Sequence, residues 1–220
     1  MQVSQPELDP AEFKGLRKMP QQARSRARVQ AMYTTAERIV GTEGVDALTM
    51  IRLAAEARVP VGTLYQFFED KAAVLDAIAY RYMDSVDSDV SDALEAGADG
   101  DWRGLTNIMF DTFIQRARAN PAYVAIRAGH YLSAELQRAD DDNIDTIAAI
   151  TRTTLVAGEN LVDTPELATV CRVAVQAADA LLQLAFRLDP TGDADTLAQA
   201  RRITLLYLED IATRHPRDTQ

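Results

Sequence analysis

Two short helical segments follow a longer amphipathic one near the N-terminus, and this spacing limits the fold more than any other feature. Apolar residues recur at helical spacing over 29–40, and Gly44 marks the end of that first helix. A second helix is predicted over 49–57, with Thr49 as its cap, and a third over 60–68. Two short helices joined by a few residues, the second facing outward, form a helix-turn-helix, whose second helix enters the DNA major groove.

The third helix has a distinct inner and outer face. At about 100° per residue, Leu64 and Phe68 share a stripe that must face the core, whereas Gly62 and Gln66 point nearly the opposite way. The flanks are Val61 and Tyr65 on one side, and Thr63 and Phe67 on the other. The outward face therefore offers a small residue that permits close approach and an amide that can hydrogen-bond a base edge.

The remaining sequence also has the helical period, so the predicted fold class is all-α. Asp70 is expected to cap a long helix from Lys71, and further helices are predicted at 102–119, from 121, and at 144–162, 165–188 and 195–213. The acidic run Asp140–Asp142 is interpreted as a solvated turn. We expect an N-terminal three-helix head (23–72) after a flexible arm (1–22), plus a larger C-terminal helical bundle (73–220), with about nine helices in total.

Charge is divided unevenly along the chain. The net charge is −10, yet residues 1–70 hold 9 Lys/Arg and 9 Asp/Glu, whereas residues 71–220 hold 14 and 24. Within 14–66 the count is 9 basic to 4 acidic residues. A basic segment in an otherwise acidic protein is expected of a module that faces nucleic acid on a solvated body.

Composition gives little support to other function classes. The chain has one cysteine, Cys171, two histidines and no phosphate-binding loop, so no nucleophile can be paired with a base and no metal-ligand spacing is present. We expect neither an enzyme, nor a metal site, nor a cofactor. No apolar run approaches the roughly 20 residues of a membrane span, and the N-terminus lacks a signal-peptide pattern. We therefore expect a cytoplasmic protein with no membrane partner.

The segment from Leu48 to Leu75, which contains IRLAAEARVPVGTLYQFFEDKAAVL, resembles the DNA-binding signature of the TetR family of repressors. The resemblance implies a homodimer with two DNA-binding heads, and a helical C-terminal domain that binds a small molecule and dimerises. It also implies release from DNA when that molecule binds. By motif position, Thr49, Thr63, Tyr65 and Lys71 would contact phosphates, and Val61, Gly62 and Gln66 would approach bases.

Three residues depart from the family pattern. Arg58 stands where the family usually has glycine, and a non-glycine residue at positive φ costs about 1 kcal/mol. Either the turn adapts, or Arg58 recovers this cost through a DNA phosphate. Pro60 replaces a capping residue but can occupy the first helical position. Phe67 stands where Tyr or His is frequent, so a phosphate contact would be missing there.

Basic residues precede and open the first helix. Arg24, Arg26 and Arg28 are predicted to touch the DNA backbone, with the arm from Lys14 reaching a minor groove. The alternative is a solubilising tail.

The C-terminal body has enough large side chains to line an apolar ligand cavity. The candidates are Met83, Trp102, Met109, Phe110, Phe113, Tyr123, Tyr131 and Phe186, with Arg127, His130, Asp179 and Gln183 as polar groups. At helical spacing, such apolar residues are more often plain core. Asp179, Gln183 and Arg187 recur every four residues, which fits an outward ion-pair ladder better than a ligand site.

The last two helices carry broad apolar faces that suggest a dimer interface. The candidates are Leu167, Val170, Ala174, Ala178, Leu181 and Leu182, followed by Ile203 and Tyr207. The alternative is that both faces are internal core.

These features lead to one hypothesis and two rivals. The hypothesis is a ligand-responsive repressor: a homodimer on a near-palindromic double-stranded operator, released by an unknown, largely apolar small-molecule effector. The first rival is an activator or architectural DNA binder without an inducer. The second is a small-molecule-binding helical protein whose head no longer binds specific DNA sequences. The departures at Arg58, Pro60 and Phe67 support this second hypothesis.

Overall fold

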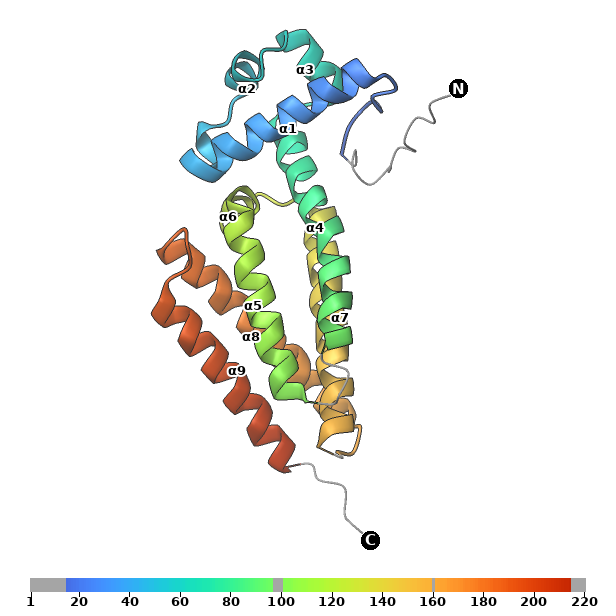
Figure 1. Ribbon diagram of the computed structural model, residues 1–220, viewed down its shortest axis with the longest axis vertical. Coiled ribbons are helices and arrows are strands. Elements are labelled where there is room, and N and C mark those ends of the chain that lie inside the picture. The colour runs from blue at the N-terminus through green and yellow to red at the C-terminus, as the bar shows by residue number, and fades with distance from the viewer. Residues whose placement is uncertain (1–14, 97–100, 160, 215–220) are drawn as a thin grey trace. The chain divides into compact units, whose positions relative to one another are not determined.

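The computed structural model describes residues 15–96, 101–159 and 161–214, and within them the chain has nine α-helices, which confirms the all-α prediction (Figure 1). The elements in chain order are α1 (Ala23–Glu43), the 3-10 helix η2 (Val45–Ala47), α2 (Met50–Glu56), α3 (Val61–Phe67), α4 (Lys71–Ala96), α5 (Trp102–Ala119), α6 (Pro121–Ala128), α7 (Ala134–Gly158), α8 (Pro165–Leu188) and α9 (Ala194–Arg214).

The chain forms two compact units. The first comprises residues 1–86 and 120–136, and the second comprises 87–119 and 137–220. The first unit thus extends beyond the head expected at 23–72 and includes the start of α4 and all of α6. Gly41 explains how closely α6 packs against α1, because a Cβ at this position would lie 3.1 Å from Pro121 and 3.2 Å from the Ala122 nitrogen.

A single hydrophobic core holds the first unit together. The predicted apolar stripe of α1 is completely buried, and it meets Leu53 of α2, Leu64 of α3 and Val74 of α4. The Tyr33 ring packs edge-on against Phe68, with 5.7 Å between ring centroids. The inward orientation predicted for Leu64 and Phe68 is therefore confirmed.

Residues 15–22, expected to belong to a flexible arm, contact the first unit. The Arg17 backbone N–H donates to the Phe67 carbonyl over 2.9 Å, Leu16 packs against the core, and Pro20 is buried. This bond satisfies a carbonyl that the end of α3 would otherwise leave unpaired. Lys14 and the residues before it lie outside the described part of the chain, and the flexibility of the arm stays a prediction.

The second unit contains α5, α8, α9 and most of α7. Its core includes Trp102, Leu155, Leu167, Cys171 and Leu208, and α8 packs along α9. The predicted bounds of α5 and α8 are confirmed.

The start of α7 differs from the prediction. The helix begins at Ala134 rather than near Ile144, and Asp140–Asp142 lie within it rather than in a turn. Ser133 explains the earlier start, because its hydroxyl accepts a hydrogen bond from the Leu136 N–H over 3.4 Å, as a helix cap does.

Helix α8 is long and apolar enough, by length and composition, to cross a bilayer, which the sequence analysis did not expect of any segment. An 18-residue window has a mean hydropathy of 1.3, and 22% of that window is buried inside the chain. One such helix is weak evidence for a membrane, and its low burial leaves apolar surface exposed.

Candidate nucleic-acid interface

The turn between α2 and α3 is fixed by backbone hydrogen bonds. The Val59 N–H donates to the Ala54 carbonyl over 3.0 Å, and the Arg58 N–H donates to the Ala55 carbonyl over 3.2 Å. This pair of bonds is the Schellman arrangement, in which one residue takes the left-handed conformation. That residue is Arg58, at φ 55°. The turn therefore keeps the left-handed conformation that glycine usually adopts, although Arg58 stands there. The exposed Arg58 side chain extends from this strained residue.

Both short helices are capped. The Thr49 hydroxyl accepts from the Arg52 N–H over 3.2 Å, as predicted. Pro60 is the cap of α3 rather than its first helical residue, which corrects the prediction. Its carbonyl accepts from the Thr63 N–H at 2.8 Å and the Leu64 N–H at 3.2 Å, so the helix starts without a side-chain cap.

The outer face of α3 is as predicted except at its last residue. Gly62 and Gln66 are exposed, as are Val61 and Tyr65 on one flank, and Thr63 is half-buried. Phe67, expected on a flank, is instead buried in the core. Phe67 lies three residues after Leu64, and the i, i+3, i+4 spacing of a core-facing stripe includes Leu64, Phe67 and Phe68. Phe67 therefore adds nothing to the outer surface.

Packing within the protein does not require glycine at position 62. A Cβ built at this position meets nothing within 4 Å. A glycine inside a helix lowers stability by roughly 0.5–1 kcal/mol relative to alanine. The open space in front of Gly62 would allow DNA to approach the backbone closely.

We predict that Gly62→Ala raises the free energy of unfolding by up to about 1 kcal/mol, because alanine favours the helix. The same change should weaken binding to a specific DNA site, because the added methyl group occupies the approach surface. Urea unfolding and fluorescence anisotropy with labelled DNA measure the two effects.

Gly104→Ala in α5 is the matched control for this substitution. There the atom nearest an added Cβ is an Asp101 carboxylate oxygen, at the far end of a side chain that can turn away. This variant therefore makes the same change within a helix of the second unit and should keep its DNA affinity. A Gly62→Ala variant that binds DNA as tightly as the wild type would contradict the assignment of this face.

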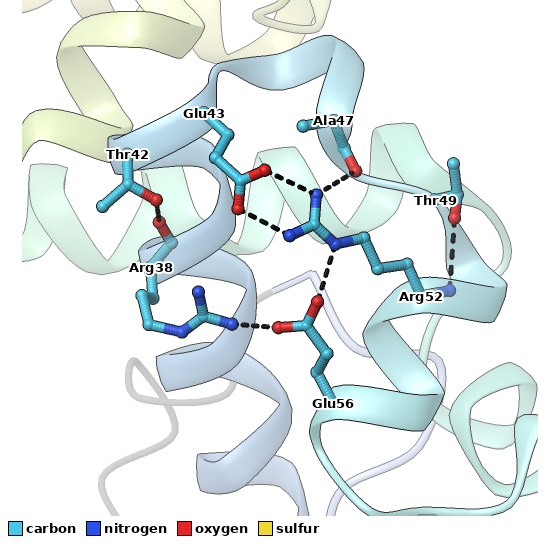
Figure 2. A network of polar contacts seen from close by, with 7 residues as sticks. All are labelled: Arg38, Thr42, Glu43, Ala47, Thr49, Arg52 and Glu56. Carbon is cyan, nitrogen blue, oxygen red and sulfur yellow. Dashed lines mark hydrogen bonds and ion pairs between the residues drawn. The ribbon is translucent and has the colours of Figure 1, made fainter.

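An ion-pair network ties α1 to α2 (Figure 2). The Arg52 Nε donates to Glu56 over 2.7 Å, and its terminal nitrogens donate to both Glu43 carboxylate oxygens at 2.5 and 3.0 Å. Arg38 pairs with the other oxygen of Glu56. Hydrogen bonds from Arg52 lower the pKa values of Glu43 and Glu56. This network was not predicted from the sequence, although the i, i+4 spacing of Arg52 and Glu56 indicates one of its ion pairs.

The lowered pKa values of Glu43 and Glu56 predict how the network depends on pH. A carboxylate whose folded pKa is depressed adds stability above its unfolded pKa, about 4.3 for glutamate, and this stability is lost as pH falls through the folded pKa. Arg52→Gln should therefore lower the melting temperature at pH 7 by a modest amount, since exposed pairs contribute little. The difference from wild type should shrink below about pH 4.3.

Thermal unfolding of both proteins between pH 3 and 7 tests this prediction. Burial raises the pKa of Glu37, but that group is unchanged in the variant and largely cancels in the comparison. A difference that is constant across the range would contradict the role of the two carboxylates.

The predicted basic contacts all lie in the first unit. Arg24 and Arg28 are exposed at the start of α1, whereas Arg26 is half-buried and its guanidinium donates to the Gln21 carbonyl over 3.5 Å. Lys71 is the half-buried first residue of α4, and Arg17 is exposed beside the end of α3. Their contacts with DNA stay predictions.

Two family models match the chain. The model for the C-terminal domain of tetracyclin repressor-like proteins matches residues 100–212, which is just over half of the chain, and the model for the tetR family of bacterial regulatory proteins matches residues 33–78. The chain belongs to the TetR family. This TetR-family protein is a transcriptional regulator with an N-terminal DNA-binding domain and a C-terminal ligand-binding domain.

Individual relatives agree with this assignment. An uncharacterized HTH-type transcriptional regulator from Haemophilus influenzae is 35% identical over 52 residues, which are 24% of this chain and 28% of that protein. The match thus spans little more than a quarter of that relative's length. A TetR-family regulator from Streptomyces coelicolor superposes with a TM-score of 0.61 at 28% identity, over 84% of this chain and 98% of that one. A TetR transcription regulator from Haloarcula marismortui shares the fold, with a TM-score of 0.60 at 19% identity over 84% and 98% of the two chains.

The predicted ligand residues of this TetR-family protein divide between its two units. In the first unit, the Tyr123 ring stacks on Tyr82, with centroids 3.7 Å apart, and Met83 packs against the same core. Arg127 is half-buried and His130 is exposed, whereas the Tyr131 hydroxyl donates to Asp46 over 3.2 Å. These contacts describe core and surface roles, and a ligand role for these residues stays a prediction.

The candidates in the second unit are mostly buried. Trp102 donates from its indole nitrogen to Glu159 over 2.7 Å. Met109, Phe110 and Phe186 are buried and Phe113 is half-buried. Gln183 donates to Asp179 over 2.7 Å, and both are half-buried, whereas Arg187 is exposed. The three therefore do not form a uniformly outward ladder.

The predicted dimer residues of the TetR-family protein fall into two groups. Leu167, Val170 and Ala174 belong to the second unit's own core, so they are corrected from interface to core. Ala178, Leu181, Leu182 and Tyr207 are half-buried, and Ile203 is 49% exposed. Three exposed apolar residues were missed: Val173, Leu188 and Leu206.

Proposed function

We propose that this protein is a ligand-responsive transcriptional repressor that acts as a homodimer on a near-palindromic operator in the cytoplasm. The observation that carries the proposal is the outer surface of α3. A glycine with open space in front of it lies beside an exposed amide, on a short helix held at its end by Arg17. A helix that presents such a surface fits the major groove.

The exposed apolar side chains of α8 and α9 support the dimer. Ile203 and Leu206 are 49% and 54% exposed on α9, and Val173 and Leu188 are exposed on α8, which packs along it. A second copy of the same surface would remove these groups from water, as a two-fold interface does. The pair of heads would then place two recognition helices about one DNA turn, ~34–36 Å, or slightly more, apart.

Ligand control follows from a difference in affinity between two states. A largely apolar effector in the C-terminal domain would prefer a state in which the two heads have the wrong separation for the operator. Operator affinity then falls by the difference in the effector's binding free energy between the states.

Three substitutions on the head test the DNA-binding part of the proposal. Tyr65→Phe and Lys71→Ala should weaken binding about equally for operator and random DNA, because phosphate contacts carry no sequence information. Gln66→Ala should instead reduce discrimination, by about 1–3 kcal/mol per contacted base pair. Anisotropy titrations with both DNAs separate the two effects. Equal losses on both DNAs for Gln66→Ala would contradict its role in reading bases.

The two rival functions give different results in the same experiments. An activator or architectural binder without an inducer would bind the operator but gain no thermal stability from any compound in a small-molecule screen. A protein with a degenerate head would show no salt-sensitive DNA binding. Against the second rival, the departures at Arg58 and Pro60 leave α3 capped and its outer face exposed.

A further inference from the structure

Helix α3 carries no charged side chain. Its sequence is VGTLYQF, and the side chains or backbone exposed on it belong to Val61, Gly62, Tyr65 and Gln66. Exposed basic side chains of the first unit instead belong to residues outside α3, including Arg17, Arg24, Arg28 and Arg58.

This residue set limits which bases α3 can read. In the major groove, guanine is read most often by Arg or Lys, adenine by Asn or Gln, and the thymine methyl group by apolar side chains. Helix α3 contains neither Arg nor Lys, so it has no side chain of the type that most often reads guanine. It offers one amide, Gln66, and one exposed aliphatic side chain, Val61, which is 39% exposed.

Val61 is suited to an apolar contact with a base. Its branched side chain has one strongly preferred rotamer in a helix, so little conformational entropy is lost on binding. Gly62 follows it directly, and the open space at Gly62 lets the backbone approach the groove floor.

We propose that α3 reads A·T base pairs, with Val61 packed against a thymine 5-methyl group and Gln66 hydrogen-bonded to adenine. This inference rests on the proposed function and names the base chemistry of the same surface. The exposed basic side chains of the first unit supply affinity for any DNA, whereas the methyl and amide contacts supply sequence preference.

Deoxyuridine substitution tests the proposal, because it removes only the thymine methyl group. The probe is a duplex with the half-sites that the purified protein selects from random DNA, with half-site thymines replaced by deoxyuridine one position at a time. At one position or more per half-site, wild-type affinity should fall about fourfold, the factor that corresponds to burial of one methyl group. Val61→Ala should bind the thymine and deoxyuridine duplexes equally.

Ile51→Ala is the matched control. Ile51 is an aliphatic side chain on the neighbouring helix α2 and is 74% exposed, and its removal should leave the deoxyuridine effect intact. If this variant loses the effect and Val61→Ala keeps it, the assignment to Val61 is overturned. If wild-type protein prefers the selected duplex over random DNA but is insensitive to every deoxyuridine, thymine reading is overturned while the proposed function stands. Absence of DNA binding would overturn both.

Discussion

Replacement of Leu206 by glutamate is expected to convert the proposed dimer into a monomer and to weaken operator binding by at least about a hundredfold. Leu206 is an exposed apolar side chain on α9, so the monomer should tolerate the change. In a two-fold interface the substitution buries two glutamates without partners, at a cost of several kcal/mol per charge. A monomer also loses the gain of roughly 10²–10⁴ that comes from holding two linked heads on one operator.

Sedimentation equilibrium and anisotropy measure the two consequences of Leu206→Glu. Gln115→Glu is the matched control, since Gln115 is exposed on α5, outside the proposed surface of α8 and α9, and the substitution adds the same charge. The control should remain dimeric and bind the operator. A Leu206→Glu protein that sediments as the wild type does would show that this part of α9 is not the interface.

Replacement of Phe68 by alanine should lower the stability of the DNA-binding unit by about 3–5 kcal/mol, the usual cost of removing a fully buried aromatic side chain. Phe68 is completely buried and its ring meets Tyr33 edge-on. It also lies between α3 and α4, so the resulting cavity would loosen the end of the recognition helix. We therefore expect DNA binding to fall together with stability.

Hydrogen exchange of the amides in α1, α2 and α3 reports the loss of stability where it occurs. Tyr65→Ala is the comparison, because it removes an exposed aromatic ring two residues before Phe67 and should leave exchange rates nearly unchanged. Slow exchange that persists in Phe68→Ala would contradict the role of this residue in the core.

Most helix faces were predictable from sequence. The buried positions of α1 and the outward positions of Gly62 and Gln66 followed from a rotation of about 100° per residue. Phe67 was wrongly placed on a flank, because the predicted stripe contained only Leu64 and Phe68, whereas a core-facing stripe also includes the position three residues after Leu64. The early start of α7 was also missed, since the acidic residues within it have a pattern that fits a turn equally well.

Contacts between distant segments were less predictable than faces. The positive φ at Arg58 was one of two alternatives that the resemblance to the family left open, because the family usually has glycine at this turn. The bond from Arg17 to Phe67 and the pairing of Arg52 with Glu43 connect residues that the sequence does not bring together. The core positions of Leu167, Val170 and Ala174 depend on which side of α8 meets its own chain, which periodicity alone does not decide.

Helix α3 is proposed to read DNA as one half of a two-fold pair. Selection of bound sequences from random duplex DNA by the purified protein tests it most directly. We predict a near-palindrome whose half-sites are centred about one helical turn, 10–10.5 base pairs, or slightly more, apart. Its binding should weaken steeply with added salt. Recovery of a single unrepeated half-site would contradict the dimer, and recovery of no enriched sequence would contradict DNA reading by this helix.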